Sequence, residues 1–63
     1  MYKLTLGVLE QEYLDLDPAM IDCFEIYPDA DFSDWHDESG HVQMDIFENN
    51  KSSLVVGTIK ELP

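Results

Sequence analysis

Five carboxylates, the only tryptophan and one of the two histidines lie within residues 29–38. Carboxylates at alternate positions suit a calcium-binding loop, and the Asp-x-Asp-x-Ser run that begins at Asp29 matches the first three ligand positions of an EF-hand. The match then fails, because Asp34 stands where the turn needs glycine and Gly40 where a bidentate glutamate closes the site. The segment is therefore predicted to form an anionic loop. Weak divalent-cation binding is one alternative function.

The other residue types that carry chemistry do not form a recognisable catalytic or metal-binding set. His36 and His41 have no thiolate nearby, so we expect exposed side chains rather than metal ligands. Cys23 falls among apolar residues, where a small buried hydrophobe is expected rather than a reactive thiol. The glycines are isolated, so no glycine-rich loop can hold a phosphate. We expect no enzymatic activity, no cofactor and no metal ligand.

Charge is the strongest signal in the sequence. The chain has 14 Asp and Glu residues against three Lys, which gives a net charge of −11. Residues 4–50 contain 13 of these carboxylates and no Lys or Arg. Such a chain cannot bind nucleic acid or an anionic membrane by charge, because phosphate contacts need cations. A solubilising surface usually mixes both signs, so the segregation favours a basic protein partner, and solubility or salt adaptation is the alternative.

Length and composition limit the architecture to one small domain, residues 1–63. A domain of this size buries only about 60% of the surface that its unfolded chain exposes, so every core residue matters. One cysteine excludes an internal disulfide framework. The first nine residues lack the apolar stretch of a secretory signal. We expect a cytoplasmic location, in the host cell if the protein is viral.

Alternation of apolar and polar residues predicts strands at residues 2–9, 41–48 and 53–60, the last two joined as a hairpin. Residues 10–16 alternate poorly, which suits either a helical turn or a bent continuation of the first strand. Residues 29–40 have no sustained period and are expected to form an ordered loop. Together with the helix described next, the prediction is an α+β domain of order β-α-β-β with a three-stranded, mainly antiparallel sheet.

A helix is predicted between the first two of these strands. Asp17 is expected as its N-cap and Pro18 at its first position, while Pro28 would stop it. The spacing of one apolar face, i, i+3, i+4 and i+7, is shared by Met20, Cys23, Phe24 and Tyr27. The alternative is an all-β fold with a strand at Cys23–Tyr27, because this run is rich in residues that favour strands.

A single helix covers one face of a sheet, whereas the alternation places Phe47 and part of the last strand on the other face. Three arrangements would account for apolar residues on that second face. The loop with Phe32 and Trp35 folds over it, a second copy of the chain covers it in a homodimer, or it is a recognition surface.

Charge and size together predict a small inhibitor or decoy that occupies the nucleic-acid-binding surface of a basic protein. In charge and size only, this resembles the DNA-mimic inhibitors that viruses and mobile elements use against host nucleases, repair enzymes or restriction systems. One strand places same-face carboxylates about 6.6 Å apart, sparser than phosphates at about 3.4 Å, so two acidic segments are needed. The predicted contact residues are Glu12, Asp15, Asp17, Asp22, Glu25, Asp29, Asp31, Asp34, Trp35, Asp37 and Glu38.

The alternative to a decoy is a generic interaction or assembly subunit that binds through the sheet face around Phe47. In that case the acidic loop only keeps the domain solvated.

Overall fold

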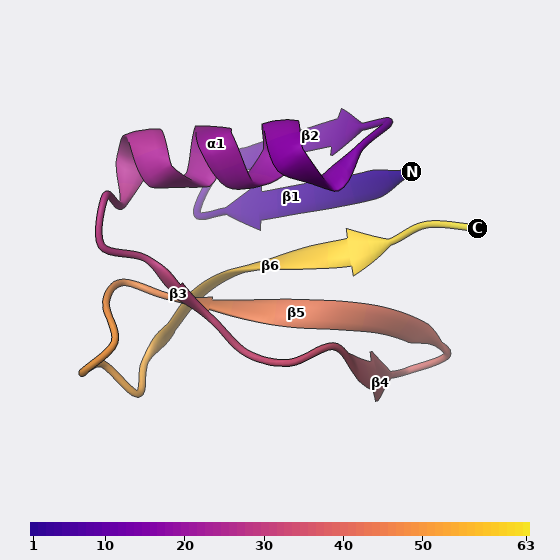
Figure 1. Cartoon of the computed structure of the whole chain (residues 1–63). Helices are drawn as coiled ribbons and strands as arrows, with labels where there is room; N and C mark the ends of the chain where they lie inside the picture. Colours follow the sequence, from indigo (N-terminus) through magenta and orange to yellow (C-terminus); the bar gives the residue numbers. More distant parts are fainter.

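The computed structural model describes residues 1–63 and shows an α+β fold, with one helix on an antiparallel sheet of six strands (Figure 1). The elements are β1 (Tyr2–Leu6), β2 (Leu9–Tyr13), α1 (Leu16–Ile26), β3 (Asp31–Phe32), β4 (His36–Glu38), β5 (His41–Phe47) and β6 (Val55–Glu61). The strand order is β2-β1-β6-β5-β3, and β4 also pairs with β5. The sheet therefore has more strands than predicted, and the all-β alternative is wrong.

The predicted first strand is a hairpin. Gly7 and Val8 form a two-residue turn between Leu6 and Leu9, where β1 ends and β2 begins. The φ angle of Gly7 is +57°, a left-handed conformation that a residue without a Cβ adopts readily. β2 is an edge strand with three exposed residues in its middle. Because neither side of that segment is buried, residues 10–12 show no alternation in the sequence.

Helix α1 begins two residues earlier than predicted. Asp15, not Asp17, is the N-cap. Pro18 then lies in the first turn, where backbone N–H groups have no partner within the helix, so its missing donor costs little. The helix ends at Ile26, before Pro28, as predicted. No helix in the structure combines the length and the apolar character needed to cross a membrane.

The two sides of the sheet differ in polarity. On the side that faces α1, here called the helix side, the register aligns Leu4, Ile59 and Met44 in one row. These residues are buried and belong to the core, which also includes Leu6, Ala19, Cys23 and Ile46. The opposite side, here called the polar side, carries the residues that alternate with them: Lys3, Thr5, Gln43, Asp45, Thr58 and Lys60.

The prediction of an apolar second face is therefore wrong for most of that face. Ile59 lies on the helix side, and the polar side is apolar only where Phe47 pairs with Val55 at one end of the β5–β6 hairpin. Alternation in β6 could not decide this, because Val55 and Val56 are adjacent apolar residues and the register shifts beside Phe47. The polar side needs no cover.

The predicted loop at residues 29–40 contains two short strands, β3 and β4, and both pair with β5. β4 continues into β5 through Ser39 and Gly40, whose φ angles are +50° and +85°. Two successive residues with positive φ are typical of a type I′ hairpin turn, which matches the twist of the strands it joins. The acidic loop is thus an edge of the sheet.

Helix α1 covers only part of the helix side. It packs against β1 and β2, and Figure 1 shows β5 and β6 lying beside it rather than beneath it. The core residues of β5 and β6 are nevertheless buried. Other side chains must therefore cover them.

Candidate protein-binding face

The connection between β3 and β4 is fastened to β5 on both sides of Trp35. The Ser33 backbone N–H donates to the Asp45 carbonyl oxygen at 3.0 Å, and Ser33 Oγ accepts from the Asp45 N–H at 2.8 Å. His36 pairs with Gln43 in the register, and its Nε2 lies 3.3 Å from Asp45 Oδ2 on the polar side. Since successive side chains point to opposite faces of a strand, the side chain of Trp35 is directed to the helix side.

Two aromatic pairs cover the part of the helix side that α1 leaves open. The rings of Tyr2 and Trp35 have centroids 6.2 Å apart, and because β6 and β5 lie between β1 and β4, the two rings together bridge those strands. Phe24 of α1 and Phe32 of β3 meet edge to face at 5.5 Å. The strands below these rings contribute buried core residues, Met44, Ile46 and Ile59. The four rings, here called the aromatic layer, close the core.

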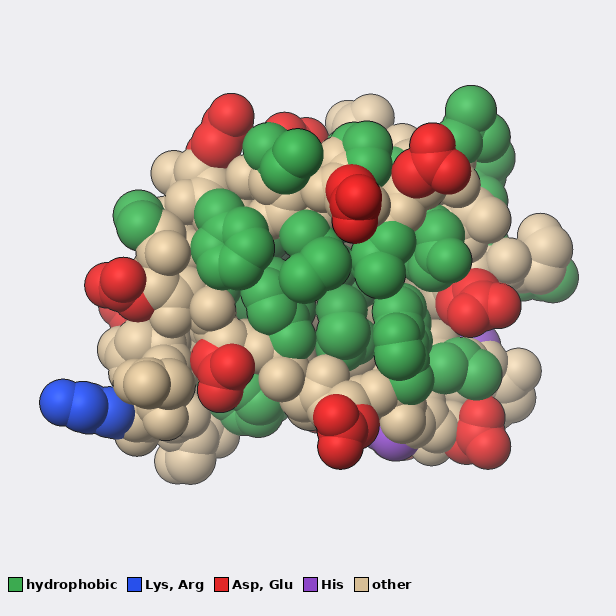
Figure 2. Space-filling model, viewed as in Figure 1, with side chains coloured by type: hydrophobic (Ala, Val, Ile, Leu, Met, Phe, Trp, Pro, Cys, Tyr) green, Lys and Arg blue, Asp and Glu red, His purple; other side chains and the backbone are tan.

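The aromatic layer is also partly exposed to solvent. Trp35 is 39% exposed and Phe24 is 40% exposed, and the neighbouring Ile21 of α1 is exposed as well. Figure 2, which views the molecule from the helix side, shows one continuous apolar area across its centre. A continuous apolar surface on a small domain is typical of an interaction site.

Carboxylates surround the aromatic layer, as Figure 2 shows. Asp37 and Glu61 both pair with Val42 in the register, so both belong to the helix side. Asp17 precedes Phe24 by two turns of α1 and so lies on the same side of that helix. Asp31, in contrast, pairs with Phe47 and so belongs to the polar side. The acidic rim, as defined here, comprises Asp17, Asp37 and Glu61, all exposed.

Two of the three lysines lie on the polar side. Lys3 and Lys60 stand opposite each other in the register of β1 and β6, on the polar side. Lys3 Nζ there forms an ion pair with Glu10 Oε1 at 3.0 Å. Lys51 lies in the turn between β5 and β6. It lines a polar hollow with Asp29 and Asp31, outside the rim.

Only some of the predicted contact residues come together. Glu12 and Glu38 pair with Lys3 and His41 in the register and belong to the polar side. The residues of α1 and its N-cap that lie outside the rim are Asp15, Asp22 and Glu25. Asp29 and Asp31 line a separate hollow at the end of β5. The predicted residues that share the aromatic face are Asp17, Trp35 and Asp37, while Asp34 precedes Trp35 in the connection between β3 and β4.

Asp22 has a structural partner. Tyr13 on β2 donates its hydroxyl hydrogen to Asp22 Oδ2 at 2.5 Å. Burial of the phenol, the hydrogen bond to Asp22 and the nearby negative charges of Asp22 and Glu25 raise the pKa of Tyr13 to about 12. The tyrosine thus stays a donor that fastens α1 to the edge strand.

Sequence reasoning missed Glu61, Tyr2 and Phe24 as parts of the face. Glu61 lies next to a lysine and outside the cation-free span, so composition drew no attention to it. The expected helix face did include Phe24, but as a core residue. The available signal was the position of Phe24 at the margin of that face, close to Ile21, an apolar residue outside the predicted face.

His41 takes part in a hydrogen-bonded row on the polar side. His41 Nε2 lies 2.9 Å from Gln43 Oε1, and Gln43 Nε2 donates to Asp45 Oδ1 at 3.0 Å. Burial raises the pKa of the Cys23 thiol, which lies in the core instead of beside the histidines. No group of three or more His, Cys, Asp or Glu side chains is arranged to hold a metal ion.

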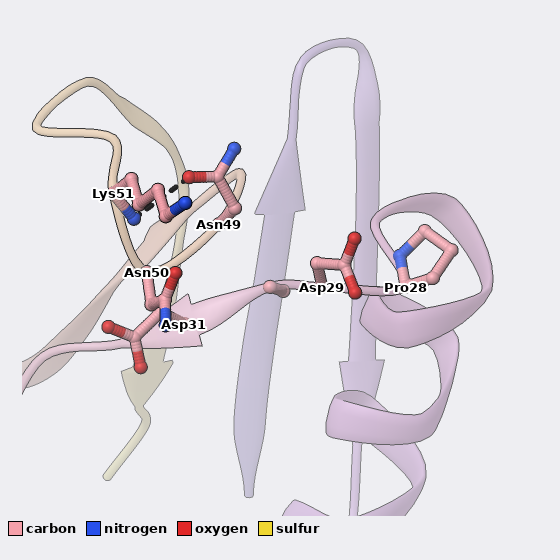
Figure 3. A pocket seen from close by; sticks show the side chains of 7 residues that line it. Pro28, Asp29, Asp31, Asn49, Asn50 and Lys51 are labelled. Carbon is pink, nitrogen blue, oxygen red and sulfur yellow. Dashed lines mark hydrogen bonds between the residues drawn. The ribbon is translucent and has the colours of Figure 1, made fainter.

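A polar hollow of about 670 Å³ opens between the segment after α1 and the β5–β6 turn (Figure 3). Asp31 and Asn50 lie side by side in it, whereas Asp29 lies apart, towards Pro28. The Lys51 backbone N–H donates to Asn49 Oδ1 at 2.9 Å. The hollow is lined almost entirely by polar side chains, so it lacks the apolar walls of a typical ligand pocket.

The geometry as a whole suits binding through a surface. Comparison with family models, with curated proteins and with solved structures finds no match to this chain. The chemistry of the aromatic layer and the acidic rim is therefore the guide to function.

Proposed function

We propose that the protein binds a basic protein partner through the aromatic layer and the acidic rim. The observation that supports this is the sorting of charge: exposed rings and carboxylates share the helix side, while Lys3 and Lys60 lie on the opposite side. Tryptophan is enriched among residues that dominate interface energies. Complementary charge steers the encounter and excludes wrong partners. The fitting partner has apolar residues surrounded by lysines and arginines.

A second copy of this chain fits the face poorly. Each copy carries a net charge of −11, and a symmetric dimer through the helix side would bring two acidic rims together. Like charges placed opposite each other across an interface cost several kcal/mol. The charge of the rim thus favours a different, basic protein over self-association.

We further propose that the partner's basic surface is one that otherwise binds nucleic acid, which makes this chain an inhibitor. The two acidic segments, residues 10–17 and 29–38, include strands at opposite edges of the sheet, β2 at one and β3 at the other. Four strand spacings separate those edges, about 19 Å, more than the major groove width of about 12 Å. Apolar surface lies between them on the helix side, whereas Glu12 of β2 belongs to the polar side. This arrangement favours electrostatic fit around an aromatic centre over imitation of phosphates one by one.

The test uses two neighbouring residues that point to opposite sides. Asp37→Lys reverses a charge of the rim, and Glu38→Lys makes the same change on the polar side. Each variant is immobilised, and proteins retained from a lysate at low and at high salt are identified. We expect a nucleic-acid-binding protein on the wild type and on Glu38→Lys at low salt, reduced retention on Asp37→Lys, and release by salt or by a DNA duplex.

Three results would contradict the proposal. Equal retention by the two variants would show that the rim is not the contact. Retention that does not change with salt would show that electrostatic attraction does not contribute to binding. A partner that binds this chain and a DNA duplex at the same time would exclude inhibition by occupancy.

The apolar part of the face is tested separately. Phe24→Ser removes an exposed ring of the aromatic layer, and Leu54→Ser removes an apolar side chain that is 70% exposed outside it. We expect faster dissociation of the captured partner from Phe24→Ser, with little change in association, and wild-type kinetics for Leu54→Ser. Identical dissociation rates for both variants would exclude the aromatic layer from the interface.

A further inference from the structure

We propose that the end of the face formed by Tyr2 and Trp35 is a binding site for a guanidinium group, so that an arginine of the basic partner anchors there. This inference rests on the proposed function, because it names the chemical group that the acidic rim and the aromatic layer would hold together. It concerns one corner of the face, where Asp37 and Glu61 accompany the two rings.

The register builds this corner from four strands. Tyr2 pairs with Glu61, Glu61 with Val42, and Val42 with Asp37, so these residues form one row across β1, β6, β5 and β4. Residues one strand apart are separated by about 5 Å, which places the backbones of Asp37 and Glu61 about 10 Å apart. Val42, between them, has a short apolar side chain. A planar cation above Val42 is within reach of both carboxylates.

The rings supply the other wall. The planes of Tyr2 and Trp35 are inclined at 41° with centroids 6.2 Å apart, too close for a cation to enter between them. Trp35 is 39% exposed, so part of the indole is open to a group that stacks on it from outside. Tryptophan is the most favourable ring for a cation above its face. Val42 and Glu61 also border an open hollow of about 230 Å³, which leaves room beside this corner.

The combination of ring and carboxylates favours arginine over lysine. A guanidinium is planar, stacks on an aromatic face and donates several hydrogen bonds in its plane, whereas an ammonium is a compact, strongly hydrated charge. Carboxylates alone would attract both. The preference needs both parts of the site, because the carboxylates hold the guanidinium in position while the indole stacks on it, and the exposed indole lies beside the acidic row.

The experiment uses the protein's single tryptophan as the reporter. Two peptides of equal length and charge, one alternating Arg and Ala and the other Lys and Ala, are titrated against the full chain while Trp35 fluorescence is followed. We expect the Arg peptide to bind about two- to fivefold more tightly. The double variant Asp37→Asn, Glu61→Gln should lose most of this difference, and the control variant Glu38→Gln on the polar side should keep it.

Each outcome decides the inference. Equal affinity for both peptides, or an Arg preference that survives in the double variant, would overturn the site. Folding of every variant is checked by circular dichroism, and backbone NMR shifts on titration must include Glu61 and Val42. If salt-dependent capture of a partner protein holds without an Arg preference, the anchor fails and the proposed function stands. If the Arg preference holds but no partner protein is captured, the guanidinium site stands and the proposed function fails.

Discussion

Replacement of Trp35 tests how the aromatic layer closes the core. In the structure its ring, with that of Tyr2, bridges β5 and β6 beyond the reach of α1. Trp35→Ala would uncover apolar residues that are now buried, among them Met44 and Ile59. The variant should therefore be less stable, even though the residue lies in an irregular connection at the edge of the sheet.

The magnitude follows from the buried area. A tryptophan buries about 250 Å² when fully covered, and Trp35 is 39% exposed, so about 150 Å² is removed from water. At 25 cal/mol per Å² this is about 3.8 kcal/mol, and residual structure in the unfolded chain lowers it to about 2–3 kcal/mol. A domain of this length has a total stability of about 3–9 kcal/mol. The substitution should remove a large part of it.

The assay is chemical denaturation followed by far-ultraviolet circular dichroism, since the fluorescent reporter is lost. Leu54→Ala is the matched control, because Leu54 is apolar and 70% exposed, and it should change stability by less than about 0.5 kcal/mol. If Trp35→Ala destabilises the protein no more than Leu54→Ala does, the ring does not cover the core. The account of the aromatic layer would then be refuted.

Two further predictions concern single contacts. The pKa of Tyr13 is raised from 10.0 to about 12 in the folded protein, so the stabilisation from its protonated hydroxyl is complete below pH 10 and is lost as pH rises towards 12. Denaturation across this pH range should show the wild type losing its advantage over Tyr13→Phe, and a constant difference would contradict the assignment. Ser39→Asn should raise stability by about 0.5 kcal/mol, because asparagine tolerates the positive φ of a type I′ turn better than serine does. Thermal denaturation against Ser53→Asn as control measures it, and a fall in midpoint would refute it.

The elements predicted from periodicity are those buried on one side along most of their length. The strand at residues 41–48 and its hairpin with the last strand are confirmed as β5 and β6. Helix α1 was predicted because Cys23 and its neighbours repeat with helical spacing, and Pro28 marks its end. An element that is buried on one side repeats its apolar residues with the period of a helix or a strand, and these segments show such a repeat.

The strands that the sequence did not predict lie at the edges. β2 exposes its middle residues, and β3 and β4 have only two and three residues. Such short segments become strands because β5 offers hydrogen-bonding groups beside them. Asp45 also fastens Ser33 in place. These interactions are between residues far apart in the chain, so a local pattern cannot reveal them.

The candidate site shows the same division. Composition identified the acidic span and Trp35, but only the register separates Asp37 on the helix side from Glu38 on the polar side. It also adds Glu61 to the rim and directs Lys3 and Lys60 away from it. Neighbours in sequence thus belong to different surfaces.

By itself the sequence determined the charge of this protein, the presence of a helix and a β-hairpin, and the concentration of carboxylates around its one tryptophan. Those are properties of composition and of local spacing. Tertiary structure alone decided that the rings of Tyr2 and Trp35 meet across two strands and that Lys3 and Lys60 lie on the side opposite to the exposed aromatics. Pairing between distant strands sets which residues share a face, because a shift of one residue moves every side chain to the other side.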